Sequence, residues 1–297
     1  MRIALSEAAM FSSKSASLLL ALLSLLCAGC TATLPQGSFF HPGAAMLPDS
    51  VRDPMRWPTG YRMDEQTYRA ADGIKLHGVA FRRDGASAAV LFFGGNAFTI
   101  GKNALSRARA LGDVGVDSYF ADYRGYGQSE GVPTIEALKA DALAVYDSLV
   151  ASGRVRPEAL IVHGHSMGTF IATYLATQRP VAGLVLESPI SNVDEYVAGR
   201  TPGFVDLLFN VKADAEARKE SNVERIRQVT APLLVLVGSK DGVTPPEMAH
   251  RVFDAATLPA ERKQLHVLTG TGHNDVPVSP EFHAAYEQYL RMVLAGR

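Results

Sequence analysis

The stretch that decides the fold is LIVHGHSMGTFIATYLA, residues 160–176, in which one apolar run turns through two glycines into another. The first four residues are typical of a buried strand, and residues 169–176 can form a helix. Between them, Gly164 and Gly168 leave room for a sharp turn that exposes the hydroxyl of Ser166 above the strand end. The stretch therefore predicts a nucleophilic serine on a strand-to-helix turn.

The same glycine-x-serine-x-glycine pattern occurs a second time, as GQSEG at residues 127–131. This copy follows a loop-like stretch and runs directly into Val132 and Pro133. No helix can already be under way there, because the residue before a proline is pushed out of the helical conformation. A short motif is a hypothesis that its structural context has to support. We therefore expect Ser166, and not Ser129, to be the nucleophile.

Apolar runs and helical patterns alternate on both sides of this turn. The runs that predict strands are residues 88–93, 116–121, 159–162, 184–186, 233–237 and, more weakly, 264–268. Helical patterns lie between them, such as residues 135–149 behind the N-cap Thr134. Asp72-Gly73 predicts a hairpin turn ahead of the first run. This alternation predicts one α/β domain, with a mostly parallel central sheet, helices on both faces and a short cap insertion at about residues 189–229.

Composition is that of an ordinary globular chain. Of its 297 residues, 47% are hydrophobic, and 29 basic side chains face 30 acidic ones. A chain of this length buries enough surface to fold without a disulfide or a metal. Near-zero net charge and the lack of a long basic run argue against a nucleic-acid partner.

A base and an acid for Ser166 are expected in loops that follow strands. His273 lies in TGTGHND, residues 269–275, directly after the last apolar run, and Asp241 lies in GSKDG, residues 238–242, directly after the run 233–237. In a parallel sheet these loops share one edge, where sites form. Glu187 and Asp275 are the rival acids. The order Ser166, Asp241, His273 is the order found in α/β-hydrolases.

The chain from about residue 65 to residue 297 resembles the α/β-hydrolase superfamily, and in particular its Bem46-like branch, which includes protein depalmitoylases and related lipid hydrolases. The segments that carry the resemblance are FGGNA at 93–97, DYRGYG at 122–127, the turn around Ser166, residues 222–232 and Gly272-His273. The branch usually has a histidine where this chain has Gly94.

The resemblance implies that the backbone N–H groups of Asn96 and Met167 form the oxyanion hole. Such donors stabilise the negative oxygen of a tetrahedral intermediate. Asp122 and Arg124 are expected to hold a loop rather than to act in catalysis. Phe98, Phe204 and Leu208 are candidates for an acyl pocket, although such side chains are more often plain core.

The N-terminus predicts export. Arg2 and Lys14 precede a leucine-rich stretch, residues 17–28, that is shorter than the roughly 20 residues of a spanning helix. The residues LCAGC, 26–30, resemble a bacterial lipobox with Cys30 as the lipidated cysteine, although Cys27 stands where leucine is usual. We expect a signal peptide over 1–30, a linker over 31–60 and the folded domain over 61–297. The alternative is a segment that only exports or anchors the chain.

Together these features predict a membrane-anchored lipoprotein of the bacterial cell envelope that acts as a serine hydrolase on carboxylic esters or thioesters, without a cofactor or metal. Its substrate would be a small acyl ester, a lipid or an acylated protein. A serine at the turn argues against the branches with a carboxylate nucleophile, the dehalogenases and epoxide hydrolases. Two alternatives stay open: a serine peptidase or aminopeptidase of the same fold, and a non-catalytic envelope protein on a hydrolase scaffold.

Overall fold

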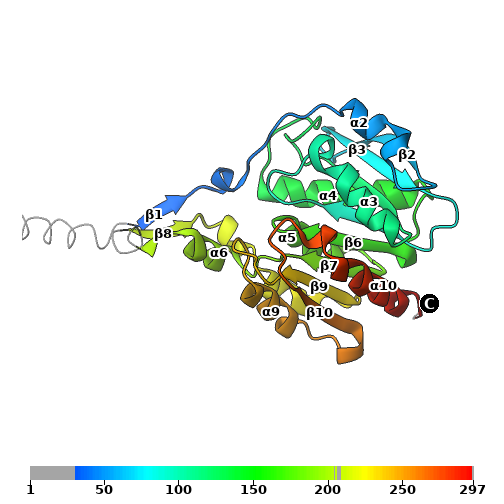
Figure 1. The fold of residues 1–297 in the computed structure, drawn as a ribbon. Coiled ribbons are helices and arrows are strands. Elements are labelled where there is room, and N and C mark those ends of the chain that lie inside the picture. Colours follow the sequence, from blue (N-terminus) through cyan, green and yellow to red (C-terminus); the bar gives the residue numbers. More distant parts are fainter. Residues whose placement is uncertain (1–30, 204, 206–208, 296–297) are drawn as a thin grey trace, which may run out of the picture.

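The fold is built on one twisted sheet of eight strands, seen in a computed structural model that describes residues 31–203, 205 and 209–295 (Figure 1). The strand order is β2-β3-β5-β4-β6-β7-β9-β10. The strands are β2 (Arg62–Arg69), β3 (Lys75–Arg82), β4 (Ala89–Phe93), β5 (Asp117–Ala121), β6 (Leu160–His165), β7 (Gly183–Glu187), β9 (Leu233–Gly238) and β10 (Lys263–Leu268). β2 and β3 pair antiparallel, as do β3 and β5, and every other pair is parallel. The predicted mostly parallel α/β sheet is confirmed.

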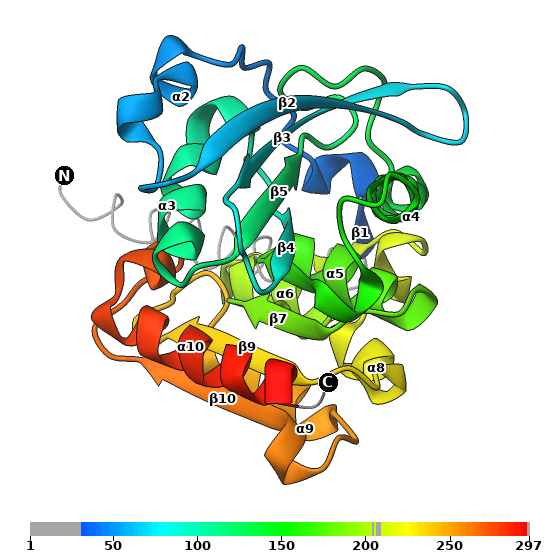
Figure 2. The ribbon, with the colours of Figure 1, turned by 90° about the vertical axis from the view of Figure 1, so that its right-hand side faces the viewer.

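Helices cover both faces of the sheet (Figure 2). The α-helices in the described chain are α2 (Asp49–Arg52), α3 (Leu105–Asp113), α4 (Ile135–Ala151), α5 (Gly168–Gln178), α6 (Val193–Arg200), α8 (Asn222–Arg225), α9 (Pro246–Ala255) and α10 (Pro280–Ala295). Thr134 caps α4 as predicted, because its hydroxyl accepts from the Ala137 N–H at 3.2 Å. None of the helices described is long and apolar enough to cross a membrane.

Two cores lie on the two faces of the sheet. Leu91 and Val162 belong to the core under α4, α5 and α9, whereas the neighbouring Phe92 and Ile161 belong to the core under α3 and α10. Successive side chains of a strand point to opposite faces, and here both faces are covered. This explains why the strand sequences are continuous apolar runs rather than alternating ones.

A third, smaller core lies in the cap insertion. Phe170 on α5 packs there with Ile190, Val193 and Val197. Beside these residues, β8 (Asn210–Ala213) forms a separate two-stranded sheet with β1 (Thr31–Leu34). The predicted insertion is thus a small cap that stands over the carboxyl ends of the central strands.

Residues 31–60 are not the free linker that their composition suggests. β1 is paired with β8 along its whole length, and Leu47 and Val51 are buried against the body. Pro, Gly and Ser break regular structure along this segment, but the apolar residues between them are enough to hold it on the surface. The predicted signal peptide, residues 1–30 with Cys30, lies outside the described residues.

Candidate active site

The turn between β6 and α5 holds Ser166 in a strained backbone conformation. Its φ angle is 53°, in the left-handed region that residues other than glycine rarely adopt. A Cβ atom at Gly168 would lie 2.1 Å from the Phe93 oxygen, and one at Gly164 would lie 2.5 Å from the Gly168 oxygen. Both positions therefore require glycine. The Ser166 N–H donates to the backbone oxygen of Glu187 at 2.9 Å, and this bond fixes the turn to β7.

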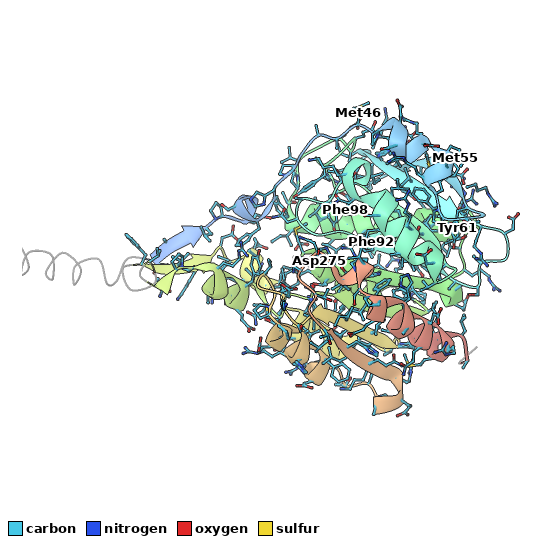
Figure 3. The ribbon with its side chains drawn as sticks, in the orientation of Figure 1. Met46, Met55, Tyr61, Phe92, Phe98 and Asp275 are labelled. Carbon is cyan, nitrogen blue, oxygen red and sulfur yellow. The ribbon has the colours of Figure 1, made fainter. Side chains whose placement is uncertain are left out.

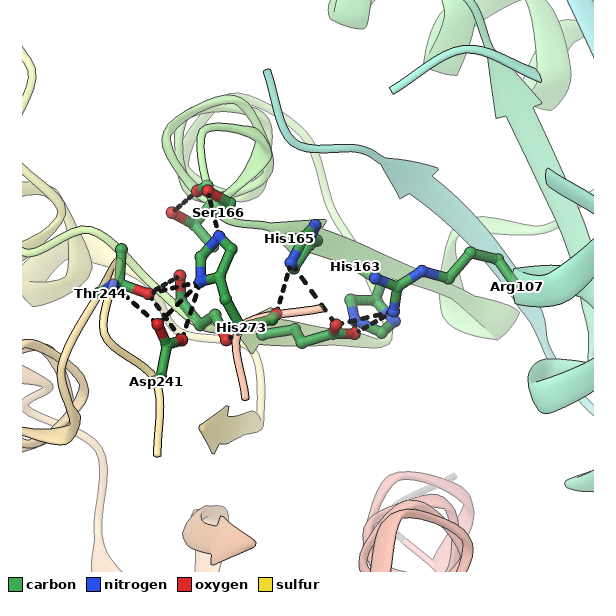
Figure 4. Close-up of polar contacts among 10 residues, drawn as sticks. Arg107, His163, His165, Ser166, Asp241, Thr244 and His273 are labelled. Carbon is green, nitrogen blue, oxygen red and sulfur yellow. Dashed lines mark hydrogen bonds and ion pairs between the residues drawn. The ribbon is translucent and has the colours of Figure 1, made fainter. Parts of the chain in front are cut away.

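The structure brings Ser166, His273 and Asp241 into one hydrogen-bonded chain (Figure 4). The Ser166 Oγ lies 3.0 Å from the Nε2 atom of His273, and the Nδ1 atom of His273 lies 2.8 Å from Asp241 Oδ2. These are distances at which a proton can pass from hydroxyl to imidazole while the carboxylate orients the ring. The rival acids are placed elsewhere: Asp275 is exposed, and Glu187 is paired with Arg107.

Asp241 is held in its ionised form. Burial by itself would raise the pKa of this carboxyl, but hydrogen bonds from His273 and from the Thr244 N–H lower it to about 2. Asp241 Oδ1 accepts from the N–H groups of Val243 and Thr244, at 2.9 and 2.8 Å. A carboxylate with this many donors stays charged and can stabilise a protonated imidazole beside it.

Thr244 is a member of the site that the sequence analysis missed. Its buried Oγ1 atom lies 3.0 Å from Asp241 Oδ2, 3.1 Å from His273 Nδ1 and 3.1 Å from the Ser188 oxygen. It therefore bridges the acid, the base and the end of β7. The available signal was its position three residues after Asp241, where a turn around an aspartate places the following side chains beside the carboxylate.

A buried ion pair lies beneath the chain of three residues. The Arg107 Nη1 atom is 2.7 Å from both carboxylate oxygens of Glu187, which is fully buried, and His163 Nε2 is 3.2 Å from Glu187 Oε2. Burial by itself would raise the pKa of Glu187, but Arg107 and the two neighbouring histidines hold it well below its usual range. This carboxylate is the fixed acceptor around which the buried histidines are arranged.

His165 connects this ion pair to the base. Its Nε2–H donates to the backbone oxygen of His273 at 3.1 Å and lies 3.8 Å from Glu187 Oε1. Burial lowers the pKa of His165 to about 3, although the Glu187 carboxylate acts in the opposite direction, so the ring is neutral. The next residue after Glu187, Ser188, also has a positive φ of 48°, and its hydroxyl lies 3.5 Å from the same His273 oxygen. The His273 loop is thus held by its backbone.

Two free backbone amides lie beside Ser166, Asn96 in the loop after β4 and Met167 in the turn between β6 and α5. In the described chain, the backbone N–H groups of Asn96 and Met167 donate to no other protein group, and both residues line the cavity that begins at Ser166. The departure at Gly94 has a steric reason, since a Cβ atom there would lie 2.1 Å from Phe98 Cγ. The Tyr123 hydroxyl supports the loop by donating to the Gly94 oxygen at 2.8 Å.

Asp122 and Arg124 have the structural role predicted for them. Asp122 accepts from the Ile100 N–H at 2.8 Å, and Arg124 forms ion pairs with Asp72 and Asp141. Both hold the loop that leads to Ser129.

A cavity of about 320 Å³ opens beside Ser166, under the cap. Its walls are mostly apolar and come from α5, α6 and the N-terminal segment, including Met167, Phe170, Val197 and Phe39. Phe98, an expected lining residue, instead packs on Phe92 in the core at 5.5 Å between ring centroids (Figure 3). Phe204 and Leu208 lie outside the described residues. No group of three or more metal-ligating side chains occurs in the described ranges.

Comparison with known proteins shows the family to which the chain belongs. Residues 84–218 match the family model described as Serine aminopeptidase, S33. An uncharacterized protein of Mycobacterium tuberculosis is 37% identical over 206 residues, which are 69% of this chain and 70% of the relative. The chain belongs to the α/β-hydrolase superfamily.

Two further proteins are less similar to this chain. The lysophosphatidylserine lipase ABHD12 of Danio rerio is 30% identical over 191 residues, covering 60% of this chain but 48% of that protein. The solved structure of the Pyrococcus furiosus esterase Pf2001 aligns with a TM-score of 0.68 at 17% identity, over 86% of this chain and 99% of that one. At this identity the second likeness concerns the fold alone.

Proposed function

We propose that this hydrolase cleaves carboxylic esters or thioesters of apolar acyl groups through an acyl-enzyme on Ser166. The observation that carries the proposal is the hydrogen-bonded chain from Ser166 through His273 to Asp241, which opens into an apolar cavity. Each of the three side chains is held by contacts that leave its reactive atom facing the next. No cofactor takes part in the proposed reaction.

In the proposed mechanism, the Ser166 Oγ attacks the acyl carbonyl while His273 Nε2 takes the hydroxyl proton. Asp241 stabilises the imidazolium that forms, because its carboxylate lies 2.8 Å from Nδ1. The free N–H groups of Asn96 and Met167 donate to the carbonyl oxygen as it becomes negative. His273 then gives the proton to the departing alcohol or thiol. In the second half of the reaction, His273 takes a proton from a water molecule, which attacks the acyl carbonyl, and returns the proton to Ser166 Oγ as the acyl group leaves as a carboxylic acid.

The cavity favours acyl esters over peptides with a free amino terminus. An aminopeptidase needs a carboxylate to bind the substrate's ammonium group. Glu220 is the carboxylate among the described cavity residues, and its two oxygens are already paired, with Lys139 at 2.9 Å and with Arg225 at 2.8 Å. The description of the matching family model keeps the peptidase as the second candidate.

A lipid or an acylated protein is the natural source of such an acyl group. The lipase named among the relatives and the motifs shared with the Bem46-like branch support an acyl ester in a lipid or on a protein as the substrate class. We also propose that the chain is exported to the bacterial envelope and anchored through lipid on Cys30, on the basis of the leucine-rich stretch and the lipobox-like residues 26–30. Incorporation of a fatty-acid label in the wild type but not in Cys30→Ala would support the anchor.

Covalent labelling tests the catalytic proposal. A fluorophosphonate probe should label the wild type at Ser166 and should not label Ser166→Ala, and acyl esters should be hydrolysed much faster than amino-acid amides. Lack of labelling in a folded wild type would favour the non-catalytic alternative. Faster cleavage of amides would favour the peptidase.

A further inference from the structure

Residues 31–41 run from the cap to the loop that holds Asn96, and are called the strap from here on. The strap consists of β1, Pro35, the short 3-10 turn η1 (Gln36–Phe39), Phe40 and His41. In Figure 1 it leads from the paired strands β1 and β8 toward the upper part of the body. The strap thus passes over the carboxyl ends of the strands, where Ser166 lies.

One end of the strap is fixed to the cap and to α4. β1 pairs in parallel with β8, from Thr31 opposite Asn210 to Leu34 opposite Ala213. The Gln36 N–H then donates to Asp214 Oδ2 at 2.5 Å, and the Gln36 side chain accepts from the Ile135 N–H at 3.1 Å. Backbone and side-chain bonds together fix this end of the strap.

The other end of the strap is fixed to Asn96. The His41 N–H donates to Asn96 Oδ1 at 2.8 Å and lies 2.9 Å from the Tyr126 hydroxyl. That hydroxyl, which belongs to a fully buried side chain, itself donates to Asn96 Oδ1 at 2.9 Å. The side chain of Asn96 is therefore held from two sides, while its backbone N–H stays free.

Between its two ends the strap forms one wall of the apolar cavity. Leu34, Phe39 and Phe40 line the cavity on this side, and Val197 and Phe170 are among the residues that line it from the cap and α5. Leu34 and Phe39 also pack against the cap core. The wall would be missing if the folded domain began at about residue 61.

We propose that the strap is the acyl-binding element of the enzyme: it forms a wall against the aliphatic part of the acyl group and it positions the Asn96 loop for the reaction. This inference rests on the proposed ester or thioester hydrolysis at Ser166. It adds that the acyl group carries an extended aliphatic chain, and that residues ahead of the hydrolase body set which chain lengths are accepted.

Acyl chain length provides the measurement. Each methylene that enters the cavity contributes about 0.8 kcal/mol, which corresponds to roughly a four-fold rise in kcat/KM. For the wild type, nitrophenyl esters from acetate to laurate should therefore show kcat/KM rising with length and then levelling off when the cavity is full. Phe39→Ala should flatten this rise, because kcat/KM should fall several-fold at the longer esters and by a smaller factor at acetate.

A cavity-filling variant gives the opposite test. Val197→Phe should make kcat/KM level off at a shorter ester, because the added ring occupies part of the cavity. Val132→Phe makes the same exchange at an exposed loop position and serves as the matched control. If Phe39→Ala fails to fold, Leu34→Ala removes another part of the same wall and should also flatten the rise.

The link to Asn96 is tested separately with Tyr126→Phe. The Tyr126 hydroxyl bonds both the His41 N–H of the strap and Asn96 Oδ1. Loss of both bonds should lower kcat roughly five-fold on short and long esters alike, with KM unchanged. Tyr68→Phe is the matched control, since the buried Tyr68 hydroxyl has no hydrogen-bond partner in the described chain.

The outcomes separate the strap from the reaction itself. If Ser166 is labelled and acetate esters are hydrolysed, but Phe39→Ala, Leu34→Ala and Val197→Phe keep the wild-type chain-length profile, the strap proposal is overturned and the proposed function stands. If Tyr126→Phe behaves like Tyr68→Phe, the positioning part is overturned. If folded wild type neither reacts with the probe nor hydrolyses acetate esters, both proposals fall.

Discussion

Two regions of this molecule share the pattern glycine-x-serine-x-glycine, and each also has a histidine and an aspartate close by. In the first, Ser166 Oγ faces the imidazole of His273, which faces Asp241. In the second, His77 Nδ1 lies 2.8 Å from Asp122 Oδ2 in the same way. The two regions therefore contain the same three residue types in contact.

The difference lies in what the serine hydroxyl touches. Ser129 Oγ accepts from the backbone N–H of His77 at 2.9 Å and donates to the backbone oxygen of Asp122 at 2.8 Å. The Nε2 atom of His77 lies 3.2 Å from Glu65 Oε1 and not beside the serine hydroxyl. In its loop, the Ser129 hydroxyl bonds to backbone groups. In the turn from β6 to α5, the Ser166 hydroxyl points to the His273 ring instead. The comparison shows that residue types and spacing become a reactive site only on an element that aims the hydroxyl.

Removing the first serine should have the largest effect. Ser166→Ala is expected to lower kcat by roughly 10⁶-fold, as loss of a serine nucleophile does in other hydrolases. Steady-state rates on a short acyl ester check this. A residual rate within about tenfold of the wild type would mean that the two regions differ less than their geometry indicates.

The two aspartates should separate rate from stability. Asp241→Asn is expected to lower kcat by about 10⁴-fold, because an amide favours the wrong tautomer of His273. Asp122→Asn should instead lower the free energy of unfolding by about 1–3 kcal/mol, since Asp122 accepts from the Ile100 N–H and from His77. Urea unfolding and ester kinetics on both variants would show the opposite pattern if the assignment were reversed.

Acid should weaken the first region in a defined pH range. The pKa of Asp241 is lowered from 3.8 to about 2 in the folded protein, so its ionised form contributes stability above pH 3.8 that is lost as the pH falls toward 2. The shift corresponds to roughly 2 kcal/mol. The stability difference between wild type and Asp241→Asn should shrink by about this amount between pH 5 and 2 in urea unfolding. A difference that stays constant with pH would contradict it.

The histidine behind the base should have a moderate effect. His165→Phe removes the donor to the His273 oxygen and is expected to lower kcat roughly tenfold with KM unchanged. His165→Gln keeps an N–H donor near that position and should recover part of the rate. Equal loss in both variants, at equal stability, would show that the ring is needed for packing and not for the hydrogen bond.

The second serine should have the smallest effect on rate. Ser129→Ala removes two hydrogen bonds to the backbone and should lower the free energy of unfolding by about 1 kcal/mol, while kcat/KM stays within a few-fold of the wild type. Thermal unfolding and ester kinetics test both parts. A loss in rate comparable to that of Ser166→Ala would overturn the distinction between the two regions.

The sheet and the principal side chains of the site could be predicted because they depend on local signals. Continuous apolar runs mark strands covered on both faces, and Ser166, Asp241 and His273 each stand next to the end of such a run or inside the turn after it. The glycine at position 94, in contrast, is explained only by the structure, because Phe98 occupies the space that a side chain there would need.

The parts that escaped prediction depend on contacts between distant segments. From the sequence, Glu187 is only a rival acid, since nothing there links it to Arg107, 80 residues earlier. Thr244 and His165 contribute through contacts with His273 and Ser188, which belong to other loops. Residues 31–60 have the composition of a linker, and only pairing with β8 and the bonds to Asn96 show them to be part of the folded body.

The backbone conformation of the serines at positions 166 and 188 has a consequence for laboratory evolution. Each has a positive φ, which costs a residue with a side chain on the order of 1–3 kcal/mol. A screen that selects for heat resistance alone would favour glycine at position 188, because glycine adopts a positive φ without steric strain. The hydroxyl beside the His273 oxygen would disappear with it. Heat-resistant descendants of this protein should therefore be screened for turnover in the same round.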